Sequence, residues 1–416
     1  MAVKGMKDYL PAYQSKLEYL ISEIKAVYES YGFLPMDSPA LEDLEILYKK
    51  SGEEIKKQIF KVESKYGMRF DLTVPLARII SENNFPRPFK RYSIGKVWRL
   101  EEPQKGRYRE FYQADIDMIG VKGVEAEAEL LSCVSRILKK FNLEYKILVN
   151  DRRILNILLE KYNFSDKENA MRILDKIEKI GIAEVKKELE RLGNAESLLN
   201  FITDHNIKDE NSVFEKIKDL SNDVYQDLKK LKELCSYYDV SFEIDFSLVR
   251  GLAYYTSTVF EIKAKNFNFS IAGGGRYDNL LGIYGKNDFA VGISIGLERL
   301  LLLLNEMNFN FSQKTKIYII SDDKTYHECI KIANKLRDLH IVELDLMNRK
   351  MDKQLEYAVK QKFDYAIIYC EKEKKEEKVK IKNLKNKMQK EIDYKTFLDS
   401  LNRNEFVNLF NKFLNL

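Results

Sequence analysis

A basic turn carries Lys105, Arg107 and Arg109 between two stretches in which apolar and polar residues alternate. The alternation across residues 91–120 predicts two antiparallel strands joined by a long basic loop. Guanidinium groups grip phosphate through paired hydrogen bonds, so this loop suits a polyanion. A solvated charged hairpin is the alternative interpretation of the same residues.

Two further arginines lie at the ends of predicted strands. Arg250 precedes Gly251 between two strand signals, and an arginine is rarely buried without a carboxylate or phosphate partner. A partner within the protein and a bound ligand are both open for it. Arg299 follows a predicted strand that begins near Val291, and it falls in the first turn of a helix, where the positive helix end favours an anion.

Small polar residues and glycines form a second group of candidates. Asp71 and Thr73 lie two apart in residues 68–77, which are predicted to form a strand that turns helical after Pro75. On one strand face this pair could hold an ammonium group, although capping of the following helix is the alternative. Residues 273–275 are three glycines at a predicted strand end, where backbone can approach a flat ligand closely.

Composition limits the classes of protein that fit. A chain of 416 residues predicts two to three domains, and a net charge of +5 permits a nucleic-acid partner without arguing for one. The four cysteines are scattered without a CxxC pair, which favours a reduced cytosolic protein without a structural zinc. The beginning of the sequence has no apolar signal core, and the apolar run at residues 300–304 is too short to span a bilayer.

The periodicity of the chain predicts the elements that position these residues. Helical spacing over residues 15–31 leads into an extended segment, residues 33–39, whose two prolines indicate an edge or interface strand. Residues 151–238 are predicted to be a helical insertion, or else a separate small helical module, with solvated charged faces. After a polar linker at residues 305–316, strands alternate with helices as in an α/β domain with a mainly parallel sheet. The lysine-rich residues 371–390 indicate a charged hairpin or loop, or else a nucleic-acid surface.

These motifs, in this order, resemble those of class II aminoacyl-tRNA synthetases, and most closely histidyl-tRNA synthetases of the archaeal or eukaryotic type. Residues 32–39, 99–111 and 296–299 resemble the three class-level motifs, numbered 1, 2 and 3. Residues 250–255 and 272–278 resemble the two histidine-specific motifs. The last two are highly specific when they occur together, and the similarity spans nearly the whole chain.

The resemblance implies a fold and an activity. The fold is an α+β catalytic domain over residues 1–314, an antiparallel sheet flanked by helices with the insertion at 151–238, followed by an α/β anticodon-binding domain over 315–416. The activity is the reaction of histidine with ATP to give histidyl-adenylate and pyrophosphate, then transfer of histidine to the 3′ end of tRNA(His). The resemblance further implies Mg²⁺ on the ATP phosphates without a protein-only metal site, a homodimer formed through motif 1, no membrane partner, and a cytoplasmic location.

The resemblance also implies roles for residues at the ATP site. Arg99 would hold the α-phosphate, and Arg107 and Arg299 the outer phosphates. Glu101 would read the adenine amino group, and Phe111 would stack on the adenine ring. Arg99 and Arg299, together with Arg250, are the implied catalytic residues.

A further set of residues is implied to bind histidine: Asp71, Thr73, Gln113, Asp117, Arg250, Tyr254, Tyr255, Gly273 and Gly274. The first three would receive the α-ammonium group, and the glycines would form the floor of the pocket. Tyr255 and Asp117 would bracket the imidazole, and Arg250 would bind the carboxylate or the α-phosphate. A site that satisfies both ring nitrogens rejects apolar analogues, because its own polar groups would otherwise lose their partners.

The sequence departs from the family pattern at a few positions. Ala253 stands where aspartate is expected, and Asp71 and Asp117 stand where bacterial members carry glutamate, which implies a different pocket or a bridging water. No histidine lies in a motif, but none is needed as a base, because the attacking carboxylate is already ionised at neutral pH.

Two other functions fit parts of the sequence. The synthetase-like regulatory subunit of ATP phosphoribosyltransferase, a protein of histidine biosynthesis, shares the core fold but typically lacks a true anticodon-binding domain and loses catalytic arginines. A non-enzymatic RNA-binding protein could reuse the same scaffold. Exchange of pyrophosphate into ATP that depends on histidine separates both of these from the enzyme.

Overall fold

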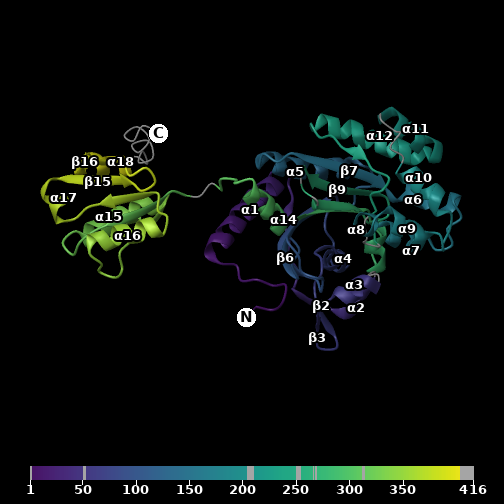
Figure 1. The fold of residues 1–416 in the computed structure, drawn as a ribbon, viewed down its shortest axis with the longest axis horizontal. Helices are drawn as coiled ribbons and strands as arrows, with labels where there is room; N and C mark the ends of the chain where they lie inside the picture. Colours follow the sequence, from purple (N-terminus) through teal and green to yellow (C-terminus); the bar gives the residue numbers. More distant parts are fainter. Residues whose placement is uncertain are drawn as a thin grey trace. The chain divides into compact units, whose positions relative to one another are not determined.

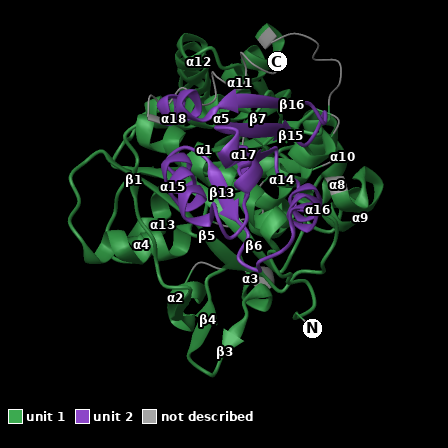
Figure 2. Cartoon of the chain, turned by 90° about the vertical axis from the view of Figure 1, so that its left-hand side faces the viewer, with its two compact units in different colours: residues 1–311 green, residues 312–416 purple. Residues whose placement is uncertain are grey.

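The chain forms two compact units, residues 1–311 and 312–416 (Figure 2). The computed structural model describes residues 2–49, 53–203, 210–249, 254–265, 267, 269–311 and 314–402. Arg250 and Ala253, both singled out from the sequence, lie outside the described residues.

Unit 1 is built on an eight-stranded sheet (Figure 1). In order across the sheet, its strands are β1 (Leu34–Pro35), β5 (Phe89–Trp98), β6 (Glu110–Ile119), β11 (Ala290–Gly296), β10 (Ser270–Arg276), β9 (Thr258–Ala264), β7 (Tyr145–Asp151) and β8 (Glu243–Ile244). Only the outermost pairs, β1 with β5 and β7 with β8, are parallel. The predicted hairpin is confirmed by β5 and β6, which pair from Phe89 opposite Ile119 to Trp98 opposite Glu110. The proline-containing strand β1 lies at the sheet edge, as its sequence predicts.

Three helices cover one face of this sheet: α1 (Pro11–Ser30), α5 (Glu125–Lys140) and α14 (Leu297–Glu306). Their apolar residues form the main core with alternate residues of β6, among them Ala114 and Ile116. Because successive side chains of a strand point to opposite faces, Gln113, Asp115 and Asp117 of β6 face away from this core. The same period that builds the core therefore places three polar groups on the other face of the sheet.

A small sheet and short helices lie between β1 and β5 in the sequence: β2 (Leu41–Asp43), α2 (Leu44–Tyr48), α3 (Glu53–Gln58), β3 (Lys61–Val62), β4 (Tyr66–Met68) and α4 (Thr73–Glu82). The helix predicted after Pro75 is confirmed, but the strand predicted before it is wrong. β4 ends at Met68, and Thr73 and Pro75 already lie in the first turn of α4, where a proline costs no helical hydrogen bond. Asp71 Oδ1 accepts a hydrogen bond from the backbone N–H of Val74 at 3.0 Å, which is the capping role left open for it.

The glycine run is also placed differently from its prediction. Residues 273–275 lie within β10, between β9 and β11, and not at a strand end. A Cβ atom at Gly274 would lie 2.0 Å from the carbonyl oxygen of Gly292 on the neighbouring strand. A Cβ atom at Gly292 would in turn lie 2.0 Å from Asp117 Oδ1. Glycine is therefore required at both positions by the close approach of neighbouring groups.

The described residues between β7 and β8 form helices and turns, as their charged helical pattern predicts: α6 (Arg152–Lys161), α7 (Lys167–Leu174), α8 (Ile177–Ile180), α9 (Ile182–Leu189), α10 (Ala195–Ile202), α11 (Glu210–Leu220) and α12 (Asn222–Tyr237). Four of these helices begin after a side chain that accepts a hydrogen bond from a backbone N–H of the first turn: Asp151, Asp166, Asn194 and Ser221. One more helix, α13 (Asp278–Ile283), follows β10.

Unit 2 has a five-stranded sheet in the order β13-β12-β14-β15-β16. Its elements are β12 (Lys316–Ile320), α15 (Tyr326–Arg337), β13 (Ile341–Leu344), α16 (Met351–Lys360), β14 (Tyr365–Ile368), α17 (Glu371–Lys375), β15 (Lys378–Asn383), β16 (Gln389–Asp393) and α18 (Tyr394–Asn402). Ile317 and Ile319 pack on one side of the sheet, and Tyr318 and Ile320 on the other, so each face has its own apolar core. The first three strands are parallel, as predicted, and β15 and β16 form the charged hairpin.

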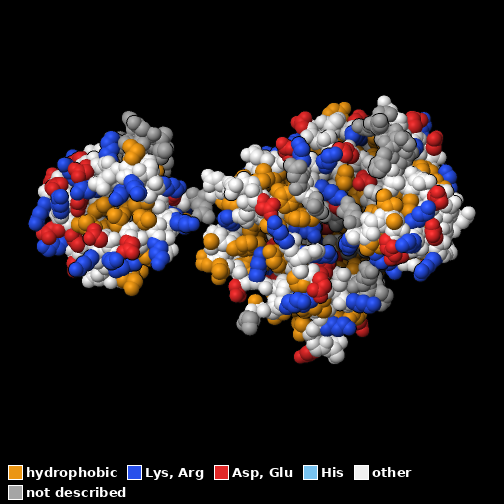
Figure 3. All heavy atoms as spheres, viewed as in Figure 1, with side chains coloured by type: hydrophobic (Ala, Val, Ile, Leu, Met, Phe, Trp, Pro, Cys, Tyr) orange, Lys and Arg blue, Asp and Glu red, His pale blue; other side chains and the backbone are white. Residues whose placement is uncertain are grey.

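Lys and Arg are interspersed with Asp and Glu over the surface of both units on the face shown in Figure 3. Within the described part of the chain, no helix is both long and apolar enough to cross a membrane.

Candidate active site

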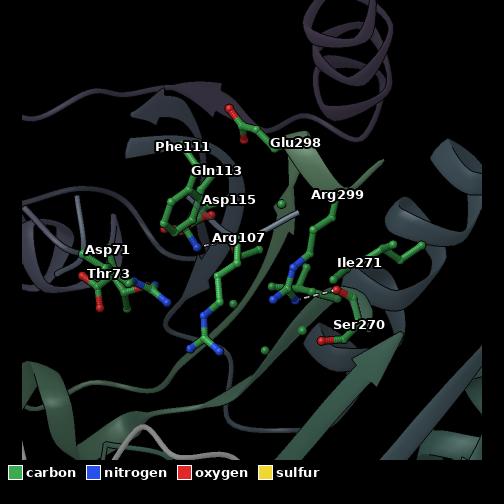
Figure 4. A pocket seen from close by; sticks show the side chains of 18 of the residues that line it. Asp71, Thr73, Arg107, Phe111, Gln113, Asp115, Ser270, Ile271, Glu298 and Arg299 are labelled. Carbon is green, nitrogen blue, oxygen red and sulfur yellow. Dashed lines mark hydrogen bonds between the residues drawn. The ribbon is translucent and has the colours of Figure 1, made fainter. Parts of the chain in front are cut away.

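The predicted site residues that the structure describes all line one cavity of about 220 Å³ in unit 1 (Figure 4). They are Asp71, Thr73, Arg99, Glu101, Arg107, Phe111, Gln113, Asp117, Tyr254, Tyr255, Gly273, Gly274 and Arg299. The start of α4, the β5–β6 loop, β6, β10 and α14 contribute to this wall. The structure therefore brings together residues that are far apart in sequence. Arg250 lies outside the described residues, and its role stays a prediction.

Three guanidinium groups are gathered on the side of the cavity formed by the basic loop and α14. Arg99 donates from Nε to the carbonyl oxygen of Phe70 at 2.8 Å, and its guanidinium carbon lies 5.3 Å from the centre of the Phe111 ring. Arg299 donates from Nη1 to the carbonyl oxygen of Ser270 at 2.8 Å. Burial and the positive charge of neighbouring Arg107 lower the pKa of Arg299. A multiply charged anion would relieve this repulsion, so the arrangement suits a chain of phosphates.

Two residues predicted to bind opposite ends of a nucleotide contact each other. Arg107 Nε donates to Glu101 Oε2 in a close ion pair. Burial by itself would raise the pKa of Glu101, but the hydrogen bond from Arg107 and the charges of Arg99 and Arg107 outweigh burial, and the pKa is lowered. Glu101 is therefore ionised, and its carboxylate is a hydrogen-bond acceptor held by Arg107 at the start of the basic loop.

A segment near the N-terminus ties the basic loop to α14, which the sequence did not predict. The Tyr9 hydroxyl donates to Glu298 Oε1 at 2.9 Å, and the backbone N–H of Tyr112 donates to Glu298 Oε2 at 2.9 Å. The backbone N–H of Arg109 donates to the carbonyl oxygen of Gly5 at 2.8 Å. One buried carboxylate, Glu298, thus joins the N-terminal segment, β6 and α14 beside the cavity.

Replacement of Tyr9 by phenylalanine should lower the free energy of unfolding by about 1–3 kcal/mol, because it leaves a buried carboxylate oxygen without its donor. Urea unfolding of the two proteins would measure the difference. Tyr237→Phe is the matched control, since Tyr237 is 78% exposed. Equal stability of Tyr9→Phe and the parent protein would show that Glu298 does not depend on this hydroxyl.

Buried carboxyl groups gather on the opposite side of the cavity. Asp71, Asp115 and Asp117 are each no more than 3% exposed. Asp117 Oδ2 lies 2.8 Å from Arg91 Nη2, and its Oδ1 accepts a hydrogen bond from the Tyr277 hydroxyl at 2.5 Å. Three aspartates therefore outnumber the two guanidinium groups that act on them, Arg91 and Arg99, which favours a cation at this end of the cavity.

Asp115 was not among the residues predicted from the sequence, although it lines the cavity between Gln113 and Asp117. Their spacing of two along a strand was the available signal. Burial and the nearby Asp117 raise the pKa of Asp115 to about 7, against the lowering effects of Arg91 and of a hydrogen bond from Ser294.

Asp115 should make the stability of the protein depend on pH. Its pKa is higher in the folded chain than in the unfolded chain, so the folded state binds the proton more tightly, and stability falls as pH rises from about 4 to about 7. Asp115→Asn should remove this loss and raise the free energy of unfolding at pH 8 by up to about 4 kcal/mol, with little change at pH 4. Urea unfolding at the two pH values tests this, and a mutational effect that is the same at both would contradict it.

Comparison with known protein families identifies relatives over almost the whole chain. A sequence model of the family "Histidyl-tRNA synthetase" matches residues 5–300, and one of the "Anticodon binding domain" matches residues 311–404. The chain is 40% identical over 409 residues to a histidine–tRNA ligase of Clostridium tetani (strain Massachusetts / E88), covering 91% of this chain and 93% of that protein. It is 37% identical over 382 residues to a histidine–tRNA ligase of Nanoarchaeum equitans (strain Kin4-M), covering 89% and 91%.

Solved structures show the same likeness. The crystal structure of histidyl-tRNA synthetase from Nostoc sp. PCC 7120 has a TM-score of 0.83 and 29% identity, covering 97% of this chain and 99% of that chain. An ATP phosphoribosyltransferase regulatory subunit/histidyl-tRNA synthetase from Bacillus halodurans C has a TM-score of 0.72, with coverage of 88% and 97%. At 21% identity, the latter is a likeness of fold alone.

Proposed function

We propose the residue roles below from the premise that this chain belongs to the histidyl-tRNA synthetase family. Its function is that of a histidine–tRNA ligase, a class II aminoacyl-tRNA synthetase with a C-terminal anticodon-binding domain. Histidine, ATP and tRNA are its substrates. The observation that supports the assignment of roles is the meeting of Arg99, Arg107 and Arg299 with a group of buried aspartates around one cavity.

The first half-reaction needs positioning and charge neutralisation more than proton transfer. A carboxylate oxygen of histidine attacks the α-phosphorus of ATP, forming the mixed anhydride while the bond to the pyrophosphate leaving group breaks. The nucleophile is already an anion, so the site has no need of a general base. We assign Arg99 and Arg250 to the α-phosphate and the reacting carboxylate, where negative charge gathers in the transition state. In the second half-reaction, a hydroxyl at the 3′ end of tRNA(His) displaces AMP from the adenylate.

The remaining contacts to ATP follow from the cavity wall. Arg107 and Arg299 would hold the outer phosphates, and Phe111 would stack on the adenine ring. Glu101 would accept a hydrogen bond from the adenine amino group, which requires that it exchange its present partner, Arg107, for the nucleotide. Such an exchange would couple ordering of the basic loop to ATP binding.

The ammonium group of histidine has acceptors prepared for it. Asp71 Oδ2 and Gln113 Oε1 are buried, and no donor among the described residues reaches either oxygen. Thr73 lies beside them in the cavity wall. We assign these three residues to the α-ammonium group, Tyr255 and Asp117 to the imidazole, and Tyr254 with Gly273 and Gly274 to the walls of the same pocket.

We propose that Mg²⁺ binds together with ATP and is not held by the protein alone. Among the residues that the structure describes, no group of three or more His, Cys, Asp and Glu side chains could hold a metal. Of the carboxylates in the cavity wall, Glu101 and Glu298 already have partners. An ion carried in on phosphate oxygens and water, as is usual for Mg²⁺ with nucleotides, fits this wall.

We further propose the domain limits and the setting of the protein. The catalytic domain would span residues 1–314 with its insertion at 151–238, and the anticodon-binding domain 315–416. A homodimer through motif 1 is supported by the edge position of β1 and by Leu34, which is 58% exposed there. A cytoplasmic location suits four cysteines that are all free and buried.

Exchange of radioactive pyrophosphate into ATP tests the proposed function. The full chain should catalyse exchange that depends on histidine, and should then charge tRNA(His). A synthetase-like regulatory subunit of ATP phosphoribosyltransferase, or a non-enzymatic RNA-binding protein, would give no histidine-dependent exchange. Absence of exchange from correctly folded protein would therefore refute the function.

A further inference from the structure

Asp115 has a buried carboxylate oxygen for which the described residues supply no hydrogen-bond donor. Asp115 is 3% exposed and lines the cavity, yet no donor among the described residues reaches its Oδ1 atom. A buried acceptor without a donor is costly, and native structures retain such groups mainly where a ligand or ordered water completes them. Its neighbour Asp117 differs in part, because the Tyr277 hydroxyl donates to its Oδ1 and Arg91 Nη2 forms an ion pair with its Oδ2, although no described donor makes a hydrogen bond to that Oδ2.

Ser294 lies where its hydroxyl group can orient the Asp115 carboxylate. Gln113 Nε2 donates to the Ser294 hydroxyl oxygen at 2.8 Å. The hydroxyl proton of Ser294 is then available for Asp115, whose pKa is lowered by its interaction with Ser294. Asp115 and Ser294 lie directly opposite each other on β6 and β11. Oδ1 is the Asp115 oxygen that no described donor reaches, and it is left for a ligand in the cavity.

Resting on the function proposed above, we infer that Asp115 is a further specificity-determining residue, whose Oδ1 atom shares with Asp117 the hydrogen bond from the ring N–H of the substrate histidine on the β6 side, while Tyr255 contacts the other ring nitrogen. The ammonium group already has two orphan acceptors, Asp71 Oδ2 and Gln113 Oε1. Asp115 lies further along β6 from the basic loop than Gln113, toward Asp117, and so toward the residues assigned to the imidazole. Only the ring of histidine offers an additional N–H donor there.

The charges around Asp115 favour a cationic ring. Asp117 on the same strand and Asp71 before α4 add negative charge. Arg91 on β5 supplies the positive charge that acts on Asp115, and Arg99 acts on Asp71. Ser294 on β11 is neutral. Three carboxyl groups thus outnumber the two guanidinium groups that act on them, Arg91 and Arg99, which suits a substrate that carries an ammonium group and a ring able to take up a proton. Histidine is the amino acid that carries both near neutral pH.

The test separates the ring from the ammonium group by means of a fragment that has only the ring. Binding of histidine and of 3-(imidazol-4-yl)propionate, which is histidine without its amino group, is measured by calorimetry on the full chain and on Asp115→Asn. The variant should weaken both ligands by the same factor, about ten- to hundredfold, the size of one hydrogen bond to a charged group. The KM for ATP in pyrophosphate exchange should stay within about twofold of the parent value.

Controls make each outcome decisive. Asp223→Asn, which removes an exposed carboxylate on α12, should bind both ligands as the parent does. Ser294→Ala removes the group that orients Asp115, so it should weaken both ligands by a smaller common factor. If Asp115→Asn weakened histidine alone, the contact would be to the ammonium group, and the inference would be wrong. Unchanged binding of both ligands would also overturn it, whereas normal binding without any pyrophosphate exchange in the parent protein would count against the proposed function instead.

Discussion

Replacement of Arg99 by alanine is expected to slow formation of histidyl-adenylate by about 10²- to 10³-fold, the effect of losing one preorganised charged group at the transition state. The side chain is fixed before the substrate arrives, because Nε is held by the carbonyl oxygen of Phe70 and the guanidinium group lies over the Phe111 ring. Its contribution to the transition state therefore costs little reorganisation. Pyrophosphate exchange at saturating histidine and ATP would measure the change in kcat.

The matched control for this experiment is Arg191→Ala, which removes an exposed arginine that does not line the cavity. Its exchange rate should equal that of the parent protein. Stability of Arg99→Ala should be checked by thermal unfolding, so that a slow rate is not mistaken for a loss of fold. A near-normal kcat in the folded variant would remove Arg99 from the catalytic set.

Removal of all residues after 311 should separate the two half-reactions. Unit 1 holds the whole described wall of the cavity and has its own apolar core, and unit 2 has separate cores on both sides of its sheet. The shortened chain should therefore keep pyrophosphate exchange within about threefold, but should charge tRNA(His) at least about 100-fold less efficiently, a loss of about 2.7 kcal/mol in interaction with the tRNA.

Both activities are measured on the same preparation, and circular dichroism of the shortened chain shows whether it folds. Charging by the full chain should also weaken as salt is added, because contacts to phosphate release counterions. Loss of exchange in a folded shortened chain would mean that unit 2 contributes to adenylate formation.

Much of the fold followed from periodicity. The alternation of two in residues 91–120 predicted β5 and β6, and the alternating strands and helices after residue 315 predicted the parallel part of unit 2. The strand predicted before Pro75 was wrong because the short alternation of apolar and polar residues there fits a strand, whereas Asp71 and Thr73 fit the start of a helix equally well. Only the contact between Asp71 and the N–H of Val74 distinguishes the two.

The candidate site shows a similar division. The motifs and their order predicted the residues that line the cavity. Motifs do not show which carboxyl groups become buried in the folded chain. Asp115 becomes a perturbed, ligand-facing group only when Asp117, Arg91 and Ser294 surround it, and these residues come from three strands. The contact of Tyr9 with Glu298 joins positions 289 residues apart, so no local pattern could predict it.

The order of strands in the sheet has a consequence for how the enzyme matures. β6 ends at Ile119 and its neighbour β11 begins at Ala290, with all the helices from α6 to α12 between them in the sequence. Two strands so far apart in the sequence pair slowly, because the chain between them loses conformational entropy when the loop closes, before any stabilising contact forms. During synthesis on the ribosome, the pocket cannot be completed until α14 has emerged. Histidine and ATP would therefore stabilise only chains that have finished this step.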